Sequence, residues 1–410
     1  MLPVNHFELR DGELWVEDVP LERIAQQVGT PTYVYAAATL DRHLRVLREA
    51  FGAERRLICY SVKACSNLSL LERFAKNGSG FDIVSGGELK RVLKAGGHPS
   101  KIVFAGVGKT KDEMAAALAA GILMFNVESA EELKALDEVG TRLGVRAPFA
   151  LRVNPDVDAK THRHISTSKA SKFGVPFKEA LALYAEARAW RGVKAVGLDF
   201  HIGSQLTKLG PVKQAIGKVA KLFRELQSNG FGLTHLDVGG GIGIRYRDEA
   251  TPTLTQWAKA VQEPLKGLDA TLVLEPGRVI VGNAAVLLTR VLYRKKQFVI
   301  VDAGMNDLIR PALYDAWHEV VPVKPRRGAK KAVDLVGPIC ESSDVLGRGR
   351  KLPPLEQGDL LAVMSAGAYG MSMSSNYNAR PRPAEVLVDT SSYRVIRERE
   401  RPEDLWRGEL

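Results

Sequence analysis

Short apolar runs rich in β-forming residues alternate with segments of helical periodicity from about residue 57 to residue 277. Strands that alternate with helices form parallel β/α units, and about eight units in roughly 220 residues match a (β/α)8 barrel. An open doubly wound sheet is the alternative, and the even spacing of the units argues against it. The expected strands are Leu57–Tyr60, Phe81–Val84, Ile102–Ala105, Leu123–Val127, Phe149–Val153, Ala195–His201, His235–Val238 and Thr271–Glu275. The amphipathic segments between them include Glu88–Ala95, Lys111–Ala120, Ala130–Leu143, Lys178–Ala189 and Val212–Ser228.

The pattern changes after Gly277, where Val, Leu and Ile dominate, the helical period disappears and turn signals recur. These features predict an antiparallel β domain. The N-terminal segment contains the strand-like run Thr32–Tyr35 and is expected to pair with that domain before Leu40–Phe51 enters the barrel as a helix. The fold class is therefore α/β plus β, a TIM-like barrel with a C-terminal β domain. We expect an N-terminal segment 1–36, a barrel 37–277 and a β domain 278–410.

The chain has 410 residues, of which 45% are hydrophobic and 26% are charged, a balance typical of folded globular proteins. Charges, Gly and Pro interrupt every apolar run before it reaches the roughly 18 residues that span a bilayer. The first ten residues lack the basic-then-apolar pattern of a secretory signal. We therefore expect a cytoplasmic protein that does not bind a membrane.

The net charge of +11 raises the possibility of nucleic-acid binding. The main basic cluster, Lys324–Lys331, is rich in loop formers and has no interleaved aromatic residue. That composition favours a solvated loop, so no nucleic-acid partner is expected. The positive field would still attract an anionic cofactor and substrate.

Metal and disulfide chemistry are not favoured by the sequence. Cys59, Cys65 and Cys340 are too few and too scattered for a disulfide framework or a zinc site. His162 and His164 lie in a loop rich in Lys, Ser and Thr that has no carboxylate partner, so no metal is expected there.

Polar residues collect at the ends of four of the expected strands: Lys63, His201, Gly239–Gly241 and Glu275–Arg278. In a (β/α)8 barrel, catalytic groups lie at the carboxyl ends of the strands. Lys63 interrupts an apolar run, and a lysine is seldom buried unless it is paired or functional. A desolvated site would lower its pKa and favour reaction with an aldehyde cofactor. The alternative is a strand-end lysine that reaches solvent.

The other three positions also suit an anionic, planar cofactor. Gly239–Gly241 offers backbone N–H groups without shielding Cβ atoms, as a phosphate cradle requires. It departs from the dinucleotide fingerprint because Ile244 replaces the third glycine, and a tight structural turn is the alternative. Glu275 could keep a pyridine nitrogen protonated and Arg278 could clamp a carboxylate, unless the two simply form a salt bridge. His201 could stack on the cofactor or be a hydrogen-bonded core residue.

Together these motifs resemble the fold-type III pyridoxal-phosphate enzymes, which include alanine racemase and the ornithine, arginine and diaminopimelate decarboxylases. The second half of the chain narrows the resemblance to the diaminopimelate decarboxylase family. The similarity extends from about Thr30 to Val388. The segments that carry it are Tyr60–Ala64, His201–Ser204, Glu275–Arg278, Asp302–Tyr314, Gly337–Asp344, Gly367–Gly370 and Ser375–Glu385.

The resemblance implies pyridoxal 5'-phosphate as cofactor and a homodimer with shared active sites. It implies that Lys63 bonds to the cofactor, that His201 stacks on its ring, and that Glu275 meets the pyridine nitrogen. Cys340 would deliver the proton to the product carbanion, across the dimer interface. The implied cofactor contacts are Lys63, His201, Ser204, Gly239, Gly240, Gly241, Glu275, Gly277, Arg278 and Tyr369. The implied substrate contacts are Arg278, Arg310, Tyr314, Glu341 and Tyr369.

The substrate interpretation depends on charge. Diaminopimelate carries an ammonium and a carboxylate at each end, so the non-reacting end must be recognised as a zwitterion. Arg310 and Glu341 supply one cation and one anion. With ornithine, Arg310 would face no carboxylate, and an unpaired buried charge costs about 2–5 kcal/mol.

Two alternatives stay open: a decarboxylase of another basic amino acid such as ornithine or arginine, and a non-catalytic regulatory relative. The second is disfavoured because Lys63 and Cys340 are both present. Four positions depart from the family pattern and affect only the fine substrate contacts. They are Ser61, Cys65, Arg163 and His164.

Overall fold

The computed structural model describes residues 5–52, 54–157 and 172–409. The chain forms two compact units. One contains residues Val46–Gly243 and Ala250–Gly277, and the other contains Met1–Arg45, Ile244–Glu249 and Arg278–Leu410. The chain passes from the second unit into the first within helix α2 (Ala37–Phe51).

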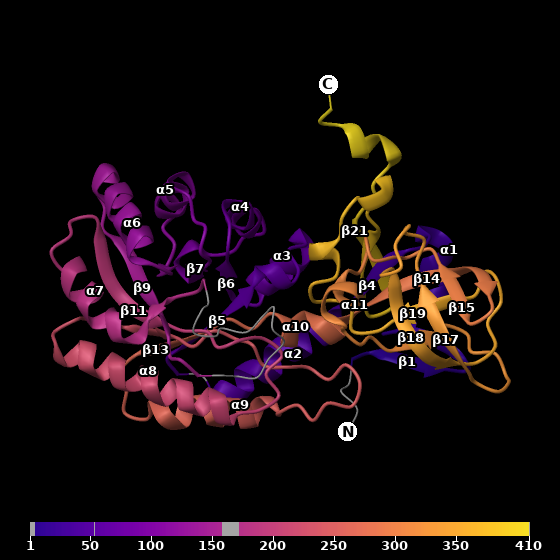
Figure 1. Cartoon of the computed structure of the whole chain (residues 1–410), viewed down its shortest axis with the longest axis horizontal. Helices are drawn as coiled ribbons and strands as arrows, with labels where there is room; N and C mark the ends of the chain where they lie inside the picture. Colours follow the sequence, from indigo (N-terminus) through magenta and orange to yellow (C-terminus); the bar gives the residue numbers. More distant parts are fainter. Residues whose placement is uncertain (1–4, 53, 158–171, 410) are drawn as a thin grey trace. The chain divides into compact units, whose positions relative to one another are not determined.

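The first unit is a closed barrel of eight parallel strands surrounded by helices (Figure 1). Every expected strand is present: β5 (Arg56–Ser61), β6 (Gly80–Ile83), β7 (Ile102–Phe104), β8 (Met124–Val127), β9 (Ala147–Asn154), β11 (Val193–Asp199), β12 (His235–Asp237) and β13 (Thr271–Leu274). The barrel closes where β13 pairs with β5, with Val273 opposite Leu57. The (β/α)8 prediction is therefore confirmed, and the open-sheet alternative is wrong. A two-residue strand, β10 (Val175–Pro176), extends the sheet beside β9.

The five expected helices are confirmed with small shifts of their ends, and the described part of this unit contains two further helices, α3 and α9. They are α3 (Leu68–Lys76), α4 (Gly86–Lys94), α5 (Lys111–Ala120), α6 (Ala130–Leu143), α7 (Ala180–Ala187), α8 (Gly210–Ser228) and α9 (Leu254–Gln262). Short 3-10 turns are η1 (Val62–Ala64), η2 (Pro99–Lys101), η3 (Phe177–Glu179) and η4 (Glu263–Leu265).

Hydroxyl caps end the loops that lead from strands into helices. The Ser85 and Ser129 side chains accept hydrogen bonds from the N–H groups of Glu88 and Glu132, at the starts of α4 and α6. Such caps satisfy N–H groups that have no partner within the helix, and each contributes about 1 kcal/mol. These two connections are short, with two residues between β6 and α4 and two between β8 and α6.

The second unit is a β domain that the N-terminal segment joins. Strand β4 (Thr32–Ala36) lies between β14 (Ala285–Lys295), with which it is antiparallel, and β20 (Ala384–Asp389). The other strands are β1 (Phe7–Arg10), β2 (Glu13–Val16), β3 (Val19–Pro20), β15 (Phe298–Val301), β16 (Val320–Pro322), β17 (Lys331–Val336), β18 (Val345–Leu352), β19 (Leu360–Val363) and β21 (Ser392–Arg397). The helices are α1 (Leu21–Val28), α10 (Arg278–Val281), α11 (Arg310–Tyr314), η5 (Gly282–Ala284), η6 (Met371–Met373), η7 (Tyr377–Ala379) and η8 (Pro402–Trp406).

The expected pairing of the N-terminal segment with the β domain is confirmed, and most strands of this unit are antiparallel. Two neighbouring pairs, β4–β20 and β15–β17, are parallel instead. Parallel neighbours need a long crossover connection rather than a hairpin. That condition is met here, because α11 and β16 separate β15 from β17, and β4 comes from the other end of the chain.

The basic segment 324–331 is exposed. Lys324 forms an ion pair with Glu22, and the Arg326 guanidinium pairs with Asp359 at 2.9 Å. Within the described ranges, no helix is long and apolar enough to cross a bilayer.

Candidate active site

The first group of site residues lies at the carboxyl ends of β5 and β6. Lys63 lies on η1 directly after β5, and its Nζ donates to Asp82 Oδ2 at 2.9 Å. The Ser61 hydroxyl donates to the same oxygen at 2.6 Å. Asp82 is fully buried, whereas the Lys63 side chain is 43% exposed. The expectation of a desolvated lysine is therefore not met: the amine lies at an open barrel mouth and is held by a buried carboxylate.

Glu275 follows β13 and belongs to a buried carboxylate cluster. One side-chain amide, Asn126 Nδ2, donates to Glu275 Oε1 at 3.2 Å and to Asp237 Oδ2 at 3.0 Å. Desolvation, followed by the nearby charges of Asp237 and Asp82, raises the pKa of Glu275. Similar causes raise the pKa of Asp237 to about 7. Glu275 forms no ion pair within the described part of the chain, so a simple Glu275–Arg278 salt bridge does not explain the motif.

The triple glycine forms the tight turn after β12. Gly239 and Gly241 have φ angles of +64° and +89°, which favour glycine. A Cβ on Gly240 would lie 2.2 Å from the Glu275 carbonyl oxygen. The structural reason for these glycines is therefore present. Gly239 and Gly240 are buried, Gly241 is partly buried, and the Gly239 N–H donates to Asp237 Oδ1 at 2.9 Å. The Gly240 N–H points to His201 Nδ1 over a long 3.4 Å.

His201 is partly buried beside this turn. Desolvation, together with the positive charges of Arg152 and Lys63, lowers its pKa to about 3. The imidazole is therefore neutral at physiological pH. A neutral ring can lie flat against an aromatic cofactor without placing a second cation beside a protonated pyridine.

This pKa makes a stability prediction for the cofactor-free protein. An unfolded histidine titrates near pH 6.5. Below that pH the unfolded chain therefore binds a proton at residue 201, whereas His201 in the folded protein stays unprotonated. The free energy of unfolding should therefore fall as the pH drops from about 6.5 toward 3. When the pH is lowered from about 7.5 to about 5.5, the free energy of unfolding of His201→Asn should fall by about 1.4 kcal/mol less than that of the wild type. Urea unfolding at both pH values measures this, and identical pH dependence would contradict the lowered pKa.

Several buried or partly buried polar residues of the two units were not singled out from the sequence. Arg152 on β9 donates to Glu128 at 2.8 Å and lies 3.9 Å from Asp199 at the end of β11. A signal for such residues does exist, because a charged residue inside an otherwise apolar parallel strand is rarely tolerated without a partner. The wider set of missed residues comprises Asp82, Asn126, Glu128, Arg152, Asp199 and Asp237 in the barrel, and Tyr246 and His318 in the second unit.

The second unit brings two predicted arginines into one aromatic-walled cluster. Arg278 begins α10 and donates from Nη1 to the Tyr246 hydroxyl at 2.7 Å, while its Cζ lies 4.9 Å from the Tyr369 ring centre. Arg310 begins α11, and its Cζ lies 4.7 Å from the Tyr246 ring centre. Both arginines are buried, at 9% and 6% exposed. Desolvation lowers the pKa of Arg310. Within the described residues, Arg310 has no carboxylate in an ion pair, so the cluster suits an anionic ligand.

Tyr314, on the same short helix as Arg310, is half-buried. Ser204, in the loop after β11, is also half-buried. Residues 161–167, which include His162, Arg163 and His164, lie outside the described residues. Among the residues that are described, no group of His, Cys, Asp and Glu could hold a metal ion.

Cys340 and Glu341 lie elsewhere in the second unit, on an exposed turn. The Cys340 N–H donates to Asn378 Oδ1 at 3.1 Å. Glu341 accepts from the Tyr377 hydroxyl at 2.5 Å and from Ser343 at 2.9 Å, and these hydrogen bonds lower its pKa. Neither residue belongs to the arginine cluster.

The cysteines differ sharply in exposure. Cys340 is exposed, whereas Cys59 and Cys65 are 0% and 2% exposed. Thiol reagents are therefore expected to reach Cys340 rather than Cys59 or Cys65.

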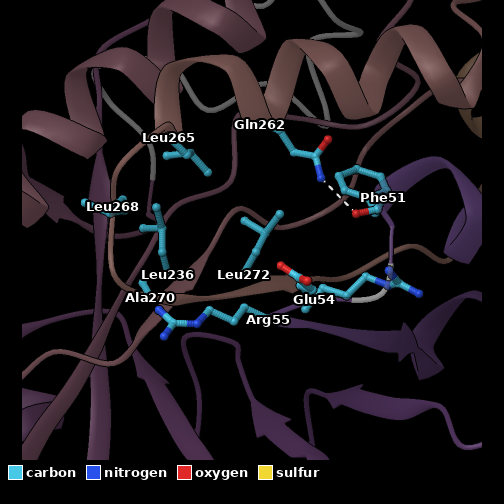
Figure 2. A pocket seen from close by; sticks show the side chains of 10 residues that line it. Phe51, Glu54, Arg55, Leu236, Gln262, Leu265, Leu268, Ala270 and Leu272 are labelled. Carbon is cyan, nitrogen blue, oxygen red and sulfur yellow. Dashed lines mark hydrogen bonds between the residues drawn. The ribbon is translucent and has the colours of Figure 1, made fainter.

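A pocket also lies at the opposite end of the barrel, near the amino ends of β5 and β13 (Figure 2). It measures about 180 Å³, and Leu236, Leu265 and Leu272 line it with charged residues at its rim. Gln262 Nε2 donates to the Phe51 carbonyl at 2.8 Å across one side. Ligand pockets are usually larger, about 300–1,000 Å³, and catalysis in this fold occurs at the other end. The pocket is therefore not the reaction site.

Residues 37–282 match the family model of the pyridoxal-dependent decarboxylases, specifically the pyridoxal binding domain. This match covers the barrel and the residues described at its mouth. The fold and site thus define a pyridoxal-phosphate-dependent decarboxylase.

The relatives define the group more narrowly. Diaminopimelate decarboxylase of Pseudomonas aeruginosa is 54% identical, over 99% of both chains, and that of Vibrio cholerae is 53% identical, over 97% of this chain and 96% of its own. The crystal structure of the Helicobacter pylori enzyme complexed with L-lysine is 46% identical, with a TM-score of 0.92 over 94% of this chain and 98% of that chain. The chain belongs to the diaminopimelate decarboxylase family.

Proposed function

We propose that this protein converts meso-2,6-diaminopimelate to L-lysine and CO2 in the cytoplasm, as a step of lysine biosynthesis. The observation that carries the proposal is buried Arg310, which lies against an aromatic wall with no carboxylate in an ion pair among the described residues. A substrate carboxylate at the non-reacting end would supply the missing charge. The relatives support the same substrate, because solved diaminopimelate decarboxylases include complexes with L-lysine.

The barrel residues fit pyridoxal 5'-phosphate. When bound, this cofactor supplies an electron sink for the electron pair that the departing CO2 leaves behind. Two buried side-chain oxygens near the mouth, Asp82 Oδ1 and Asn126 Oδ1, have no hydrogen-bond partner in the described structure. The raised pKa values of Glu275 and Asp237 show an excess of buried acids. Such a cluster stabilises an added cation, as a protonated pyridine nitrogen would be.

Each predicted residue then has a role in binding the cofactor. Lys63 would hold the cofactor aldehyde, His201 would cover the ring, and Glu275 would keep the pyridine nitrogen protonated. The phosphate would take hydrogen bonds from the turn after β12 and its neighbours. The proposed phosphate and flanking contacts are Ser204, Gly239, Gly240, Gly241, Gly277, Arg278 and Tyr369.

The substrate's distal end would be bound by Arg310, with Arg278, Tyr314 and Tyr369. We further propose a homodimer in which Cys340 and Glu341 serve the partner's site. Their exposure on a turn apart from the arginine cluster supports this arrangement. Glu341 would pair with the distal ammonium, and the Cys340 thiol would hold the proton that is delivered to the carbon losing CO2.

The proposed function is tested by product analysis of purified protein with meso-diaminopimelate, ornithine, arginine and lysine. We expect CO2 and L-lysine from diaminopimelate and little turnover of the other three. Preferential turnover of ornithine or lysine would instead identify a decarboxylase of another basic amino acid. No turnover of any of the four, with cofactor bound, would favour a regulatory relative.

Replacing Arg310 with leucine should selectively weaken turnover of diaminopimelate. The change leaves the distal carboxylate desolvated without its cation, so kcat/KM should fall. The loss of transition-state stabilisation calculated from that fall should be about 2–5 kcal/mol. Cofactor content, measured by absorbance, should be unchanged. Full retention of kcat/KM would refute distal recognition by this arginine.

A further inference from the structure

We propose that His318 is a positioning residue, which orients Arg310 toward the carboxylate at the non-reacting end of the substrate. The proposal extends the function proposed above and depends on it. His318 would hold the buried Arg310 guanidinium in one orientation, and the remaining N–H donors of Arg310 could then bind the ligand carboxylate.

The geometry leaves only one arrangement of hydrogen atoms. Arg310 Nη1 lies 2.8 Å from His318 Nε2. A guanidinium has five N–H donors and no acceptor, so the histidine nitrogen must accept this hydrogen bond. The proton of His318 is therefore on Nδ1, which donates to the Met364 carbonyl oxygen at 2.9 Å. Both ring nitrogens are used, and the tautomer and ring orientation are fixed.

The backbone that anchors this chain of hydrogen bonds is rigid. Met364 directly follows strand β19, which pairs with both β14 and β16. The Met364 N–H in turn donates to the Glu319 carbonyl at 2.8 Å. The order of contacts is thus sheet, Met364 carbonyl, His318 ring and Arg310 guanidinium. On its other side Arg310 faces the Tyr246 ring, which also meets the His318 ring edge-on at 5.4 Å and 74°.

The imidazole stays neutral, as an acceptor must. His318 is completely buried. Desolvation, followed by the positive charges of Arg310, Arg278 and Arg350, lowers its pKa to about 3, against the opposing effect of the Met364 carbonyl. Besides these groups, Tyr246 is the titratable side chain in ring contact with it. A protonated ring would have to donate to a guanidinium that can only donate, so the neutral form and the Arg310 hydrogen bond require one another.

The product of the proposed reaction isolates the contribution of Arg310. When one end of diaminopimelate loses CO2, the carboxylate that remains in L-lysine is the one at the distal end. Cadaverine has the same carbon chain and both amines but lacks this carboxylate. The ratio of the dissociation constants for the two ligands therefore measures distal carboxylate recognition without any turnover.

The experiment compares three variants of the cofactor-loaded enzyme. His318→Phe keeps a buried planar ring against Tyr246 but removes the acceptor, and His318→Gln restores an amide that can both accept and donate. Arg310→Leu is the reference for complete loss. Calorimetry with L-lysine and with cadaverine gives the affinities, and steady-state kinetics with meso-diaminopimelate gives kcat and KM.

We expect His318→Phe to weaken L-lysine binding by about 10- to 100-fold, as the loss of a hydrogen bond to a charged group implies, with cadaverine binding within about twofold. KM for diaminopimelate should rise more than kcat falls, and His318→Gln should recover most of the L-lysine affinity. If the Phe variant does not fold, His318→Asn replaces it, because its shorter amide can still reach Met364 but not Arg310.

The outcomes separate this inference from the proposed function. If Arg310→Leu lowers the preference for L-lysine over cadaverine but His318→Phe, or His318→Asn used in its place, retains it, His318 does not position Arg310 and the inference is overturned. If Arg310→Leu also retains the preference, the distal role of Arg310 is wrong, and the inference fails with it. Equal weakening of both ligands in His318→Phe, without rescue by Gln, would show general structural damage and would likewise overturn it.

Discussion

Replacing Lys63 with alanine is expected to abolish decarboxylation, with a loss of roughly 1,000-fold or more. Lys63 is the amine at the mouth of the barrel, and Asp82 holds it at 2.9 Å. Without it, no amine at this position can bond to the cofactor aldehyde or exchange it with substrate. Wild-type protein should carry cofactor that borohydride fixes covalently, and peptide mapping should find it on Lys63.

The matched control is Lys94→Ala, because Lys94 is an exposed lysine at the end of α4 in the same unit. This variant should retain wild-type activity and cofactor attachment. A fixed cofactor that maps to another lysine, or a Lys63→Ala variant with substantial turnover, would show that Lys63 does not hold the cofactor.

Mixing two inactive variants should restore about a quarter of wild-type activity. The first parent is Lys63→Ala, and the second combines Cys340→Ala with Glu341→Ala. If each site uses Lys63 of one chain and Cys340 of its partner, a mixed dimer has one site with both lesions and one site with neither. After full subunit exchange at equal amounts, about half of the dimers are mixed, and half of their sites are intact.

Native mass spectrometry would follow the exchange, and a mixture of tagged and untagged Lys63→Ala chains would control for effects of mixing alone. Complete exchange without recovery would mean that each chain builds its own site. Recovery well above a quarter would mean that one of the parents is not inactive. The experiment therefore tests both the homodimer and the placement of Cys340 and Glu341.

The barrel could be predicted because each of its elements is encoded locally. The run Phe149–Val153 is apolar except for Arg152, and Ala130–Leu143 has apolar residues at helical spacing after a capping serine. The polar ends of the strands were equally visible, since Lys63, His201 and Glu275 each follow an apolar run. The parallel pairing of β4 with β20 could not be read in this way, because their partnership joins opposite ends of the chain.

The sequence also could not predict the environment of each functional group, meaning its burial and its hydrogen-bond partners. Lys63 interrupts an apolar run, which suggested a buried amine, yet its side chain is 43% exposed. Its partner Asp82 lies on the next strand, and no spacing rule links the two. His318 illustrates the same limit: its sequence neighbours do not reveal that its two nitrogens join Met364 to Arg310.

The sequence by itself therefore determined the β/α repeat, the β domain, the family and the list of candidate catalytic and binding residues. Those properties depend on the polarity of neighbouring residues and on motifs a few residues long. Only the tertiary structure decided which charges meet. Asn126 on β8, Asp237 on β12 and Glu275 directly after β13 are far apart in sequence, and the Asn126 amide donates to both acids. Coulombic and desolvation effects depend on distance in space rather than along the chain, so the tertiary structure determines the pKa values that the site uses.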